Sequence, residues 1–230
     1  MNDQETGLDF SMVIASTVHD MKNSLASLIQ AHGQWVKDLP DAQRGTPEQG
    51  VIEYEFAHLN GMLVQLLGLY KLGVNQLPLR PDYHELDDFI EAQLAFHQEV
   101  LDSRGIVARY HVDDFGLPGF FDRELIGSVV SNVVINAIRF ARQHVLISAG
   151  QVGEQLVICI NDDGPGFPER MIEHQTDYVL GLNQSSGSTG LGLYFAANIA
   201  RQHQRQGVTG HIEIANGGEL GGGLFSIYLP

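Results

Sequence analysis

A candidate nucleophile lies near the N-terminus of the 230-residue sequence, where His19 is followed by Asp20 and, four residues on, by Asn23. Residues four apart on a helix share one face, so the His19 and Asn23 side chains would lie together in a helical segment. An exposed imidazole beside a carboxylate can act as a nucleophile when a base or hydrogen-bond acceptor keeps one ring nitrogen deprotonated. The chain has 10 histidines, and His19 taken alone also fits an ordinary solvated histidine on a helix.

Two asparagines and an arginine, Asn132, Asn136 and Arg139, form a second candidate group. The asparagines stand four apart and face the same way on a helix, with Arg139 following them. Amide oxygens are ligands for hard cations such as Mg²⁺, and a nearby arginine can neutralise phosphate oxygens. Because asparagine is a poor helix former, a pair inside an otherwise apolar helix needs a reason, either a bound cation or hydrogen bonds to neighbouring loops.

Acidic and glycine residues follow a strand-like segment, in the order Asp162, Asp163, Gly164, Pro165 and Gly166. A carboxylate at a strand end can accept a hydrogen bond from an exocyclic amine such as adenine N6, and glycines let the backbone approach a ligand closely. Aspartate and glycine also dominate ordinary β-turns. A ligand site and an acidic turn therefore both stay open on these residues alone.

A glycine-rich loop that contains Gly187, Thr189, Gly190, Leu191 and Gly192 runs into a predicted helix. The backbone N–H groups of such a loop and the positive end of the helix can bind phosphate. It is not a Walker loop, because no lysine follows the glycines, and no strand directly precedes it as a dinucleotide fingerprint requires.

Two segments in the first third of the chain have apolar or large residues in alternating steps of four and three. This spacing is typical of helices that pack against each other. Residues 40–47 between them are rich in turn and breaker residues, which predicts an antiparallel helical hairpin. Because two helices alone bury one face poorly, we expect two hairpins to close into a four-helix bundle, which makes the protein a homodimer. The two series are Ile14, Val18, Met21, Leu25, Leu28, His32, Trp35 and Leu39, and Ile52, Phe56, Leu59, Leu63, Leu66 and Tyr70.

Beyond the hairpin, Pro78 and Pro81 end the second helix and predict a linker. Strand-like and helix-like segments then alternate, which is typical of a two-layer α/β domain with helices on one face of a mixed sheet. We expect an α+β chain with the hairpin over residues 1–77, the linker over 78–82 and the second domain over 83–230. Strands are predicted at Ile106–Val112, Val145–Ala149, Leu156–Asn161, His211–Ala215 and Leu224–Leu229, and helices near His84–Ser103, Asp122–Arg142 and Gly192–Gln204.

Composition narrows the function classes. A formal net charge of −15 excludes a nucleic-acid partner, because a phosphate backbone repels an acidic surface, whereas a nucleotide site can neutralise phosphate locally. No apolar stretch approaches the roughly 20 residues needed to cross a bilayer, and the acidic N-terminus is unlike a secretory signal. The single cysteine, Cys159, excludes an internal disulfide and suits a reducing compartment. We expect a soluble cytoplasmic protein.

In their order along the chain, the four groups resemble the motifs of two-component histidine kinases. Residues 19–25 resemble the H-box, 132–137 the N-box, 162–166 the G1 box and 187–193 the G2 box. Each motif alone is unspecific, whereas all four in this order are not expected by chance. The resemblance covers nearly the whole chain, and it implies a dimerisation and phosphotransfer hairpin followed by an ATP-binding domain of the Bergerat (GHKL) type.

The resemblance also implies a role for each residue. His19 would be the phosphoacceptor, Asp20 the acid that polarises it, and Asn23 the residue that orients water when the partner is dephosphorylated. The implied partners are the receiver domain of a response regulator and a second copy of the chain. The input would come from a separate sensor protein, from a binding event on this core, or from a region of the protein beyond this sequence. Around ATP, the resemblance implies Asn136 as the Mg²⁺ ligand, Asn132 and Arg139 at the phosphates, Asp162 at the adenine amine, and Gly164, Gly166, Gly187, Thr189, Gly190, Leu191 and Gly192 as the residues that shape the pocket.

Three other functions are weighed against an ATP-dependent protein-histidine kinase. A phosphotransfer adapter or phosphatase without kinase activity would use the hairpin alone, but its nucleotide motifs would tend to be eroded. A Bergerat-type ATPase or serine kinase would leave the long heptad hairpin that carries His19 without a purpose. A purely structural coiled coil would leave the glycine loops unexplained.

Overall fold

The N-terminal hairpin consists of two long antiparallel helices, α1 (Phe10–Asp38) and α2 (Pro47–Gly73), joined through a short 3-10 turn at Asp41–Gln43. The structure is a computed structural model that describes residues 10–114, 116–179 and 191–230. Thr46 starts α2 with a reciprocal cap, because its side chain accepts from the Gln49 N–H while the Gln49 side chain accepts from the Thr46 N–H. This pair satisfies N–H groups that have no partner within the helix and fixes where α2 begins.

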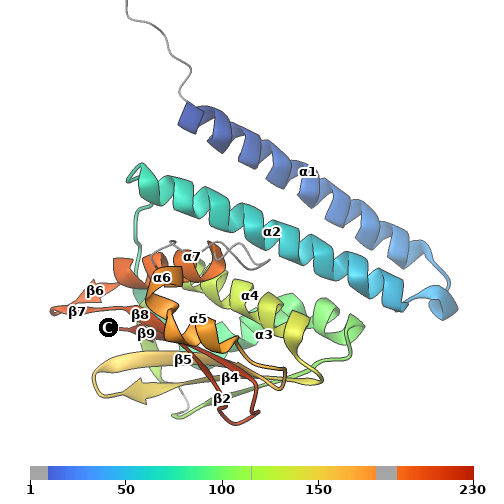
Figure 1. Cartoon of the computed structure of the whole chain (residues 1–230). Coiled ribbons are helices and arrows are strands. Elements are labelled where there is room, and N and C mark those ends of the chain that lie inside the picture. Colours follow the sequence, from blue (N-terminus) through green and yellow to red (C-terminus); the bar gives the residue numbers. More distant parts are fainter. Residues whose placement is uncertain (1–9, 115, 180–190) are drawn as a thin grey trace, which may run out of the picture.

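The rest of the chain folds around a five-stranded mixed sheet with the order β2-β4-β5-β9-β8. The β2–β4 pair is parallel and the other pairs are antiparallel. Helices cover one face of this sheet, so the expected α+β chain with a two-layer second part is confirmed (Figure 1). The elements after the hairpin are β1 (Asp82–Glu85), α3 (Leu86–Ser103), β2 (Val107–Val112), β3 (Pro118–Phe121), α4 (Arg123–Phe140), β4 (His144–Val152), β5 (Gln155–Asp162), α5 (Glu169–Glu173), α6 (Gln175–Val179), α7 (Leu191–Gln202), β6 (Gln204–Arg205), β7 (Val208–Thr209), β8 (His211–Asn216) and β9 (Gly223–Leu229).

The core lies between the sheet and the helices α3, α4 and α7. Alternate residues of the central strands point into it, as the period of two along a strand requires. Leu156, Ile158 and Ile160 of β5 are buried there beside Phe225 and Ile227 of β9. The helices contribute Phe89, Ile138 and Phe195, each 1% exposed or less.

The predicted bounds differ from those of the structure by up to three residues, and the difference at His84 has a clear cause. The helix expected near His84–Ser103 begins at Leu86, because His84 and Glu85 belong to the short strand β1. Both residues pair with β3, and the His84 ring packs 5.2 Å from the ring of Phe121. Strand pairing with residues 33 and 35 positions away in the sequence outweighs the local helical pattern here. The sequence pattern also did not predict β1, β3, α5, α6 or the small β6–β7 hairpin.

Helix α2 has two packing faces, of which only the one directed to α1 was predicted. The other is a stripe of residues, again in steps of three and four, that packs onto α3, α4 and α7. Tyr54 in this stripe is buried, and the Arg104 guanidinium lies 5.3 Å from the centre of its ring. At Gly68 an added Cβ would stand 2.6 Å from the Phe195 ring, so glycine permits the close approach of α2 and α7. We call Gly50, Tyr54, Ala57, Gly61, Gln65, Gly68 and Leu72 the inner stripe of α2.

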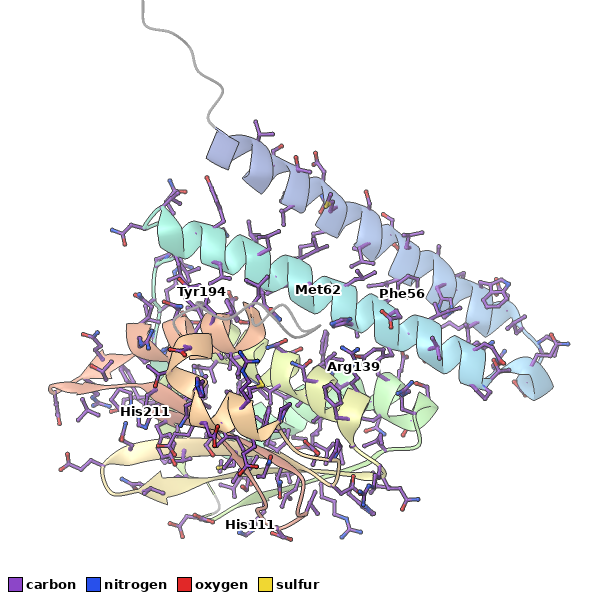
Figure 2. The ribbon with its side chains drawn as sticks, in the orientation of Figure 1. Phe56, Met62, His111, Arg139, Tyr194 and His211 are labelled. Carbon is purple, nitrogen blue, oxygen red and sulfur yellow. The ribbon has the colours of Figure 1, made fainter. Side chains whose placement is uncertain are left out.

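As a result, α2 lies between α1 and the second part of the chain (Figure 1). Arg139 of α4 and Tyr194 of α7 lie on the side of this part that faces α2 (Figure 2). Among the described residues, no helix is both long and apolar enough to span a membrane.

Candidate functional site

His19 lies on the outer surface of α1, with 66% of its side chain exposed. The Asn23 Nδ2 atom lies 3.2 Å from His19 Nδ1, and an Asp20 carboxylate oxygen lies 3.9 Å from the same nitrogen. Asn23 and Asp20 therefore both approach Nδ1, and no described residue forms a hydrogen bond with Nε2. The predicted trio is brought together on one surface of the helix.

This arrangement is compatible with a tautomer in which Nε2 of His19 is available for chemistry. The amide of Asn23 can present either its NH₂ or its oxygen to Nδ1, since the two orientations differ only by a flip of the side chain. When Nδ1 carries the proton, the Asn23 oxygen and the Asp20 carboxylate are its nearby acceptors, and Nε2 keeps a lone pair directed to solvent. An imidazole in that tautomer is a nucleophile at Nε2.

A second cluster forms where α4 meets the start of α7. The Asn132 Oδ1 atom accepts a hydrogen bond of 2.5 Å from Gln65 Nε2 of α2 and a longer one of 3.5 Å from Asn136 Nδ2. Gly192 lies against the same side chain, since an added Cβ there would stand 2.8 Å from Asn132 Nδ2. The structure thus places Asn132, Asn136 and the N-terminal turn of α7 side by side. Arg139 lies further along α4, exposed, with its guanidinium 5.3 Å from the Phe140 ring.

Asp162 ends β5 and forms a small cradle with glycines. Its Oδ1 atom accepts from the N–H of Gly164 at 2.7 Å and from that of Gly223 at 3.3 Å. A Cβ on Gly223 would stand 2.8 Å from Oδ2, and Gly166 adopts a φ of 80° that favours glycine. One carboxylate oxygen therefore orders the turn while Oδ2 remains an acceptor next to side-chain-free backbone.

Two neighbours of Asp162 were not predicted as site residues. The amide of buried Asn161 donates to Gly217 and Gly223 carbonyls, at 3.0 and 2.7 Å, and accepts from the Leu220 N–H at 2.8 Å. It therefore holds the glycine-rich β8–β9 loop beside Asp162. A polar residue late in an apolar strand was the only sequence signal for this role.

Asp163 is the other neighbour, and it joins the end of α4 to the start of β4. Burial acts to raise the pKa of Asp163, but hydrogen bonds from the N–H groups of Gln143 and His144, the His144 ring and the Arg142 N–H outweigh burial and lower the pKa from 3.8 to about 2. The ionised carboxylate is therefore a structural anchor, and it fixes the turn that carries Asp162.

The remaining predicted residues fall on the glycine-rich loop. Gly187, Thr189 and Gly190 lie outside the described residues, while Leu191 and Gly192 form the start of α7. The structure therefore presents three groups, namely the His19 trio on α1, the Asn132 cluster where α4 meets α7, and the Asp162 cradle at the end of β5. Gln65, which joins α2 to Asn132, was missed by the sequence analysis.

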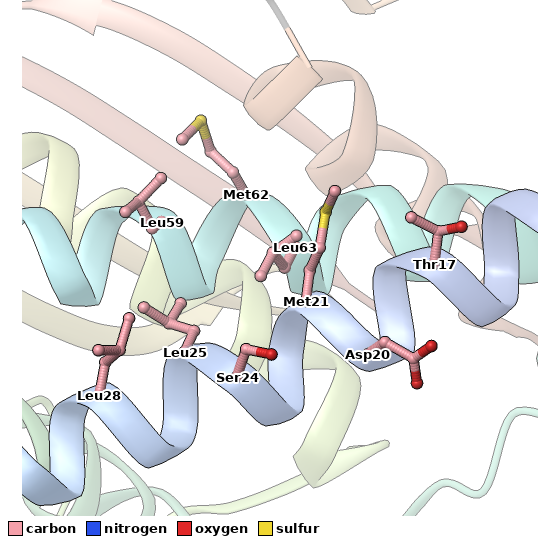
Figure 3. A pocket seen from close by; sticks show the side chains of 9 residues that line it. All are labelled: Thr17, Asp20, Met21, Ser24, Leu25, Leu28, Leu59, Met62 and Leu63. Atoms are coloured by element: carbon pink, nitrogen blue, oxygen red, sulfur yellow. The ribbon is translucent and has the colours of Figure 1, made fainter.

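A groove of about 500 Å³ lies between α1 and α2, close to Asp20. Apolar side chains from both helices project along it, with Thr17 and Asp20 at one end (Figure 3). None of its lining residues belongs to the Asn132 cluster or to the Asp162 cradle. Its lining consists of Thr17, Asp20, Met21, Ser24, Leu25, Leu28, Leu59, Met62 and Leu63.

Comparison with known proteins identifies a family that matches part of the chain. Residues 121–230 match the family described as histidine kinase-, DNA gyrase B-, and HSP90-like ATPase. The signal transduction histidine-protein kinase AfsQ2 of Streptomyces coelicolor is 24% identical, with 94% of this chain and 41% of that protein covered. The sensor histidine kinase ZraS of Escherichia coli is 27% identical over 94% of this chain and 44% of its own length. The chain thus spans less than half of these relatives.

Solved structures show the same fold. The histidine kinase AdeS of Acinetobacter baumannii superposes with a TM-score of 0.56 at 21% identity, covering 92% of this chain and 96% of that one. The catalytic domain of the histidine kinase ThkA superposes with a TM-score of 0.56 at 22% identity, over 66% of this chain and 97% of that domain. The resemblance noted from the four motifs is confirmed.

Proposed function

We propose that this chain, which has the architecture of a histidine kinase catalytic core, is an ATP-dependent protein-histidine kinase that phosphorylates His19. The observation that supports the proposal most directly is the environment of His19, where Asn23 and Asp20 lie 3.2 and 3.9 Å from Nδ1 while Nε2 stays open to solvent. A structural histidine on a helix surface needs neither neighbour. An ATPase domain in the same chain supplies a phosphoryl donor for that nitrogen.

The residues around Asp162 fit ATP. The free Oδ2 atom of Asp162 is the acceptor for the adenine amine, and the glycine backbone beside it leaves room for a flat ring. Asn136 and Asn132 supply amide oxygens for Mg²⁺, and the N-terminal turn of α7 and Arg139 favour phosphate oxygens. Mg²⁺, when bound, neutralises charge on the phosphates during transfer.

The chemistry that we assign to the chain is a displacement by His19. Nε2 forms a bond to the γ-phosphorus while the bond to the bridging oxygen breaks, and ADP leaves with that electron pair. Asp20 and the Asn23 oxygen hold the proton at Nδ1 and stabilise the positive charge that develops on the ring. Phosphohistidine then transfers the group to an aspartate on the receiver domain of a response regulator.

We further propose that the chain works as a homodimer. Two members of the predicted α1 series are buried, since Val18 and Leu25 are 4% and 7% exposed. Three others remain open to solvent, because Met21, Leu28 and Trp35 are each more than 50% exposed. A second hairpin that covers this open face would complete the four-helix bundle.

Dephosphorylation of the regulator is a second activity that one observation favours. The Asn23 amide lies beside His19 on the exposed surface and can orient a water molecule there. An Asn23→Ala variant should still label from ATP but dephosphorylate the regulator more slowly. An unchanged dephosphorylation rate would remove Asn23 from that role.

The test of the kinase proposal is incubation with γ-labelled ATP and Mg²⁺, followed by acid and alkali treatment. Label that survives alkali and is lost in acid identifies phosphohistidine. A protein that binds nucleotide but carries only acid-stable label would be a kinase of hydroxyl groups instead. A protein with neither label nor nucleotide binding would be a phosphotransfer adapter or phosphatase.

A further inference from the structure

The inner stripe of α2 carries one amide among small and apolar residues. Gln65 is 6% exposed, at the interface where α2 packs on α4 and α7. A buried amide is costly unless it is hydrogen-bonded, and Gln65 meets this requirement by donating from Nε2 to Asn132 Oδ1 at 2.5 Å. The side chain that receives this bond is a member of the candidate nucleotide site.

The Asn132 oxygen has no free lone pair in this arrangement. An amide oxygen has two acceptor positions, and here Gln65 Nε2 and Asn136 Nδ2 each direct an N–H toward it. A cation cannot share a lone pair with an N–H donor, because the two positive groups repel. Ligation of a metal ion by Asn132 Oδ1 therefore requires that one donor leaves, and Gln65 is the donor that belongs to the hairpin.

We propose that docking of the hairpin and binding of a metal–nucleotide complex compete for Asn132 Oδ1, and that Gln65 is the residue through which they compete. The inference rests on the proposed nucleotide site. Gln65 acts through Asn132 and is thus a positioning residue. By linkage, whatever pulls α2 away strengthens metal–nucleotide binding, and bound metal–nucleotide weakens the docking of α2 by the same factor.

The position of His19 agrees with such competition. In the docked arrangement α2 separates α1, the helix that carries His19, from the ATPase domain (Figure 1). The contact that occupies Asn132 is therefore also part of the arrangement that keeps α1 apart from this domain. Release of Gln65 frees Asn132 Oδ1 to bind the metal ion. It also weakens the packing of α2, the helix that lies between α1 and the nucleotide site.

The first test is titration of the whole chain with a fluorescent ATP analogue, with Mg²⁺ and with EDTA in its place. The variant is Gln65→Leu, which keeps the volume of the buried side chain but cannot donate to Asn132. We expect it to bind the Mg²⁺ complex about 3- to 10-fold more tightly than the wild type, the range that one net hydrogen bond represents. With EDTA the two proteins should bind alike. Gln76→Leu, at an exposed position beyond α2, is the matched control and should follow the wild type.

The second test follows the wild-type chain by hydrogen exchange and needs no variant. The Mg²⁺ complex of a non-hydrolysable ATP analogue should raise the exchange of residues 61–69 of α2, and the metal-free analogue should not. Equal or weaker Mg²⁺-dependent binding by Gln65→Leu, or unchanged exchange of α2, overturns the competition while leaving the nucleotide site in place. A wild-type chain that binds no nucleotide under either condition overturns the proposed function itself.

Discussion

His203 accepts a hydrogen bond of 3.0 Å at Nε2 from the backbone N–H of Asp122. At its other nitrogen the ring contacts the Ile199 carbonyl oxygen at 2.9 Å, so Nδ1 must carry the only ring proton. Asp122 caps α4 and His203 directly follows α7. One neutral imidazole therefore joins the two helices that carry Asn132 and Gly192.

The first prediction concerns the loss of folding stability at low pH. Burial lowers the pKa of His203, and burial lowers the pKa of His97 from 6.5 to about 4. Because both rings are neutral in the fold, the stability that they contribute is complete above pH 6.5 and is lost as pH falls below it, a loss that for His97 continues toward pH 4. For His97 the loss is roughly 1.4 kcal/mol per pH unit within that window.

Urea unfolding at pH 7.5, 6 and 5 measures this loss. His97→Gln can keep a hydrogen bond to Ser131 but does not titrate, so its stability should fall less steeply with acid than that of the wild type. A variant with the same slope as the wild type would show that His97 is not the group responsible.

The second prediction concerns the phosphoacceptor. His19→Gln should abolish alkali-stable labelling from γ-labelled ATP, because no ring nitrogen remains at that position. Its affinity for ATP should match that of the wild type, since α1 has no role in the nucleotide site. His58→Gln, on α2, is a histidine control that should label normally. Full labelling of His19→Gln would move the phosphoacceptor elsewhere.

The third prediction concerns the adenine contact. Asp162→Asn keeps one oxygen for the Gly164 N–H but replaces the free acceptor by an NH₂ group, which would face the adenine amine as a second donor. We expect affinity for ATP to fall by about 10- to 100-fold, as the loss of a charged acceptor with an unpaired donor left behind implies. Calorimetric titration measures it, with Asp88→Asn on the exposed surface of α3 as the control. An unaltered affinity of Asp162→Asn for ATP would show that Asp162 only stabilises the turn and does not contact adenine.

The fourth prediction concerns assembly. Leu28 and Leu59 are 57% and 43% exposed on the open face of the hairpin. A Leu28→Glu, Leu59→Glu double variant should convert a dimer into a monomer, because it would bury charges in the proposed interface. Light scattering after gel filtration gives the mass. Phe96→Glu, at a 71% exposed position on α3, should leave the dimer intact, and dissociation of this control instead would place the interface outside the hairpin.

Periodic patterns allowed most of the fold to be predicted. The heptad steps of the first third indicated α1 and α2, and alternating apolar residues indicated the strands of the five-stranded sheet. The pattern failed where distant pairing decides the structure, as at His84 and Glu85 in β1. It also missed the inner stripe of α2, because a count of large apolar residues overlooks glycines such as Gly68 that serve close approach.

The site shows the same division. Motif spacing singled out Asn132, Asn136 and Asp162, and the structure places them around the start of α7 and the end of β5. The roles of Gln65 and Asn161 were not predicted, because their partners in other elements lie 67 and at least 56 residues away in the sequence. Their roles depend on burial, which sequence spacing does not reveal.

The two packing faces of α2 have a consequence for how this helix can evolve. A single 27-residue segment must match α1 on one side and three helices of the ATPase domain on the other. Few residues of α2 lie outside both packing faces, whereas α3 exposes much of one side to solvent. In a comprehensive substitution library, α2 should therefore be depleted of tolerated changes. An adaptive change in the hairpin would then be expected to coincide with compensating changes in α4 or α7, so that the two parts of the chain diversify together.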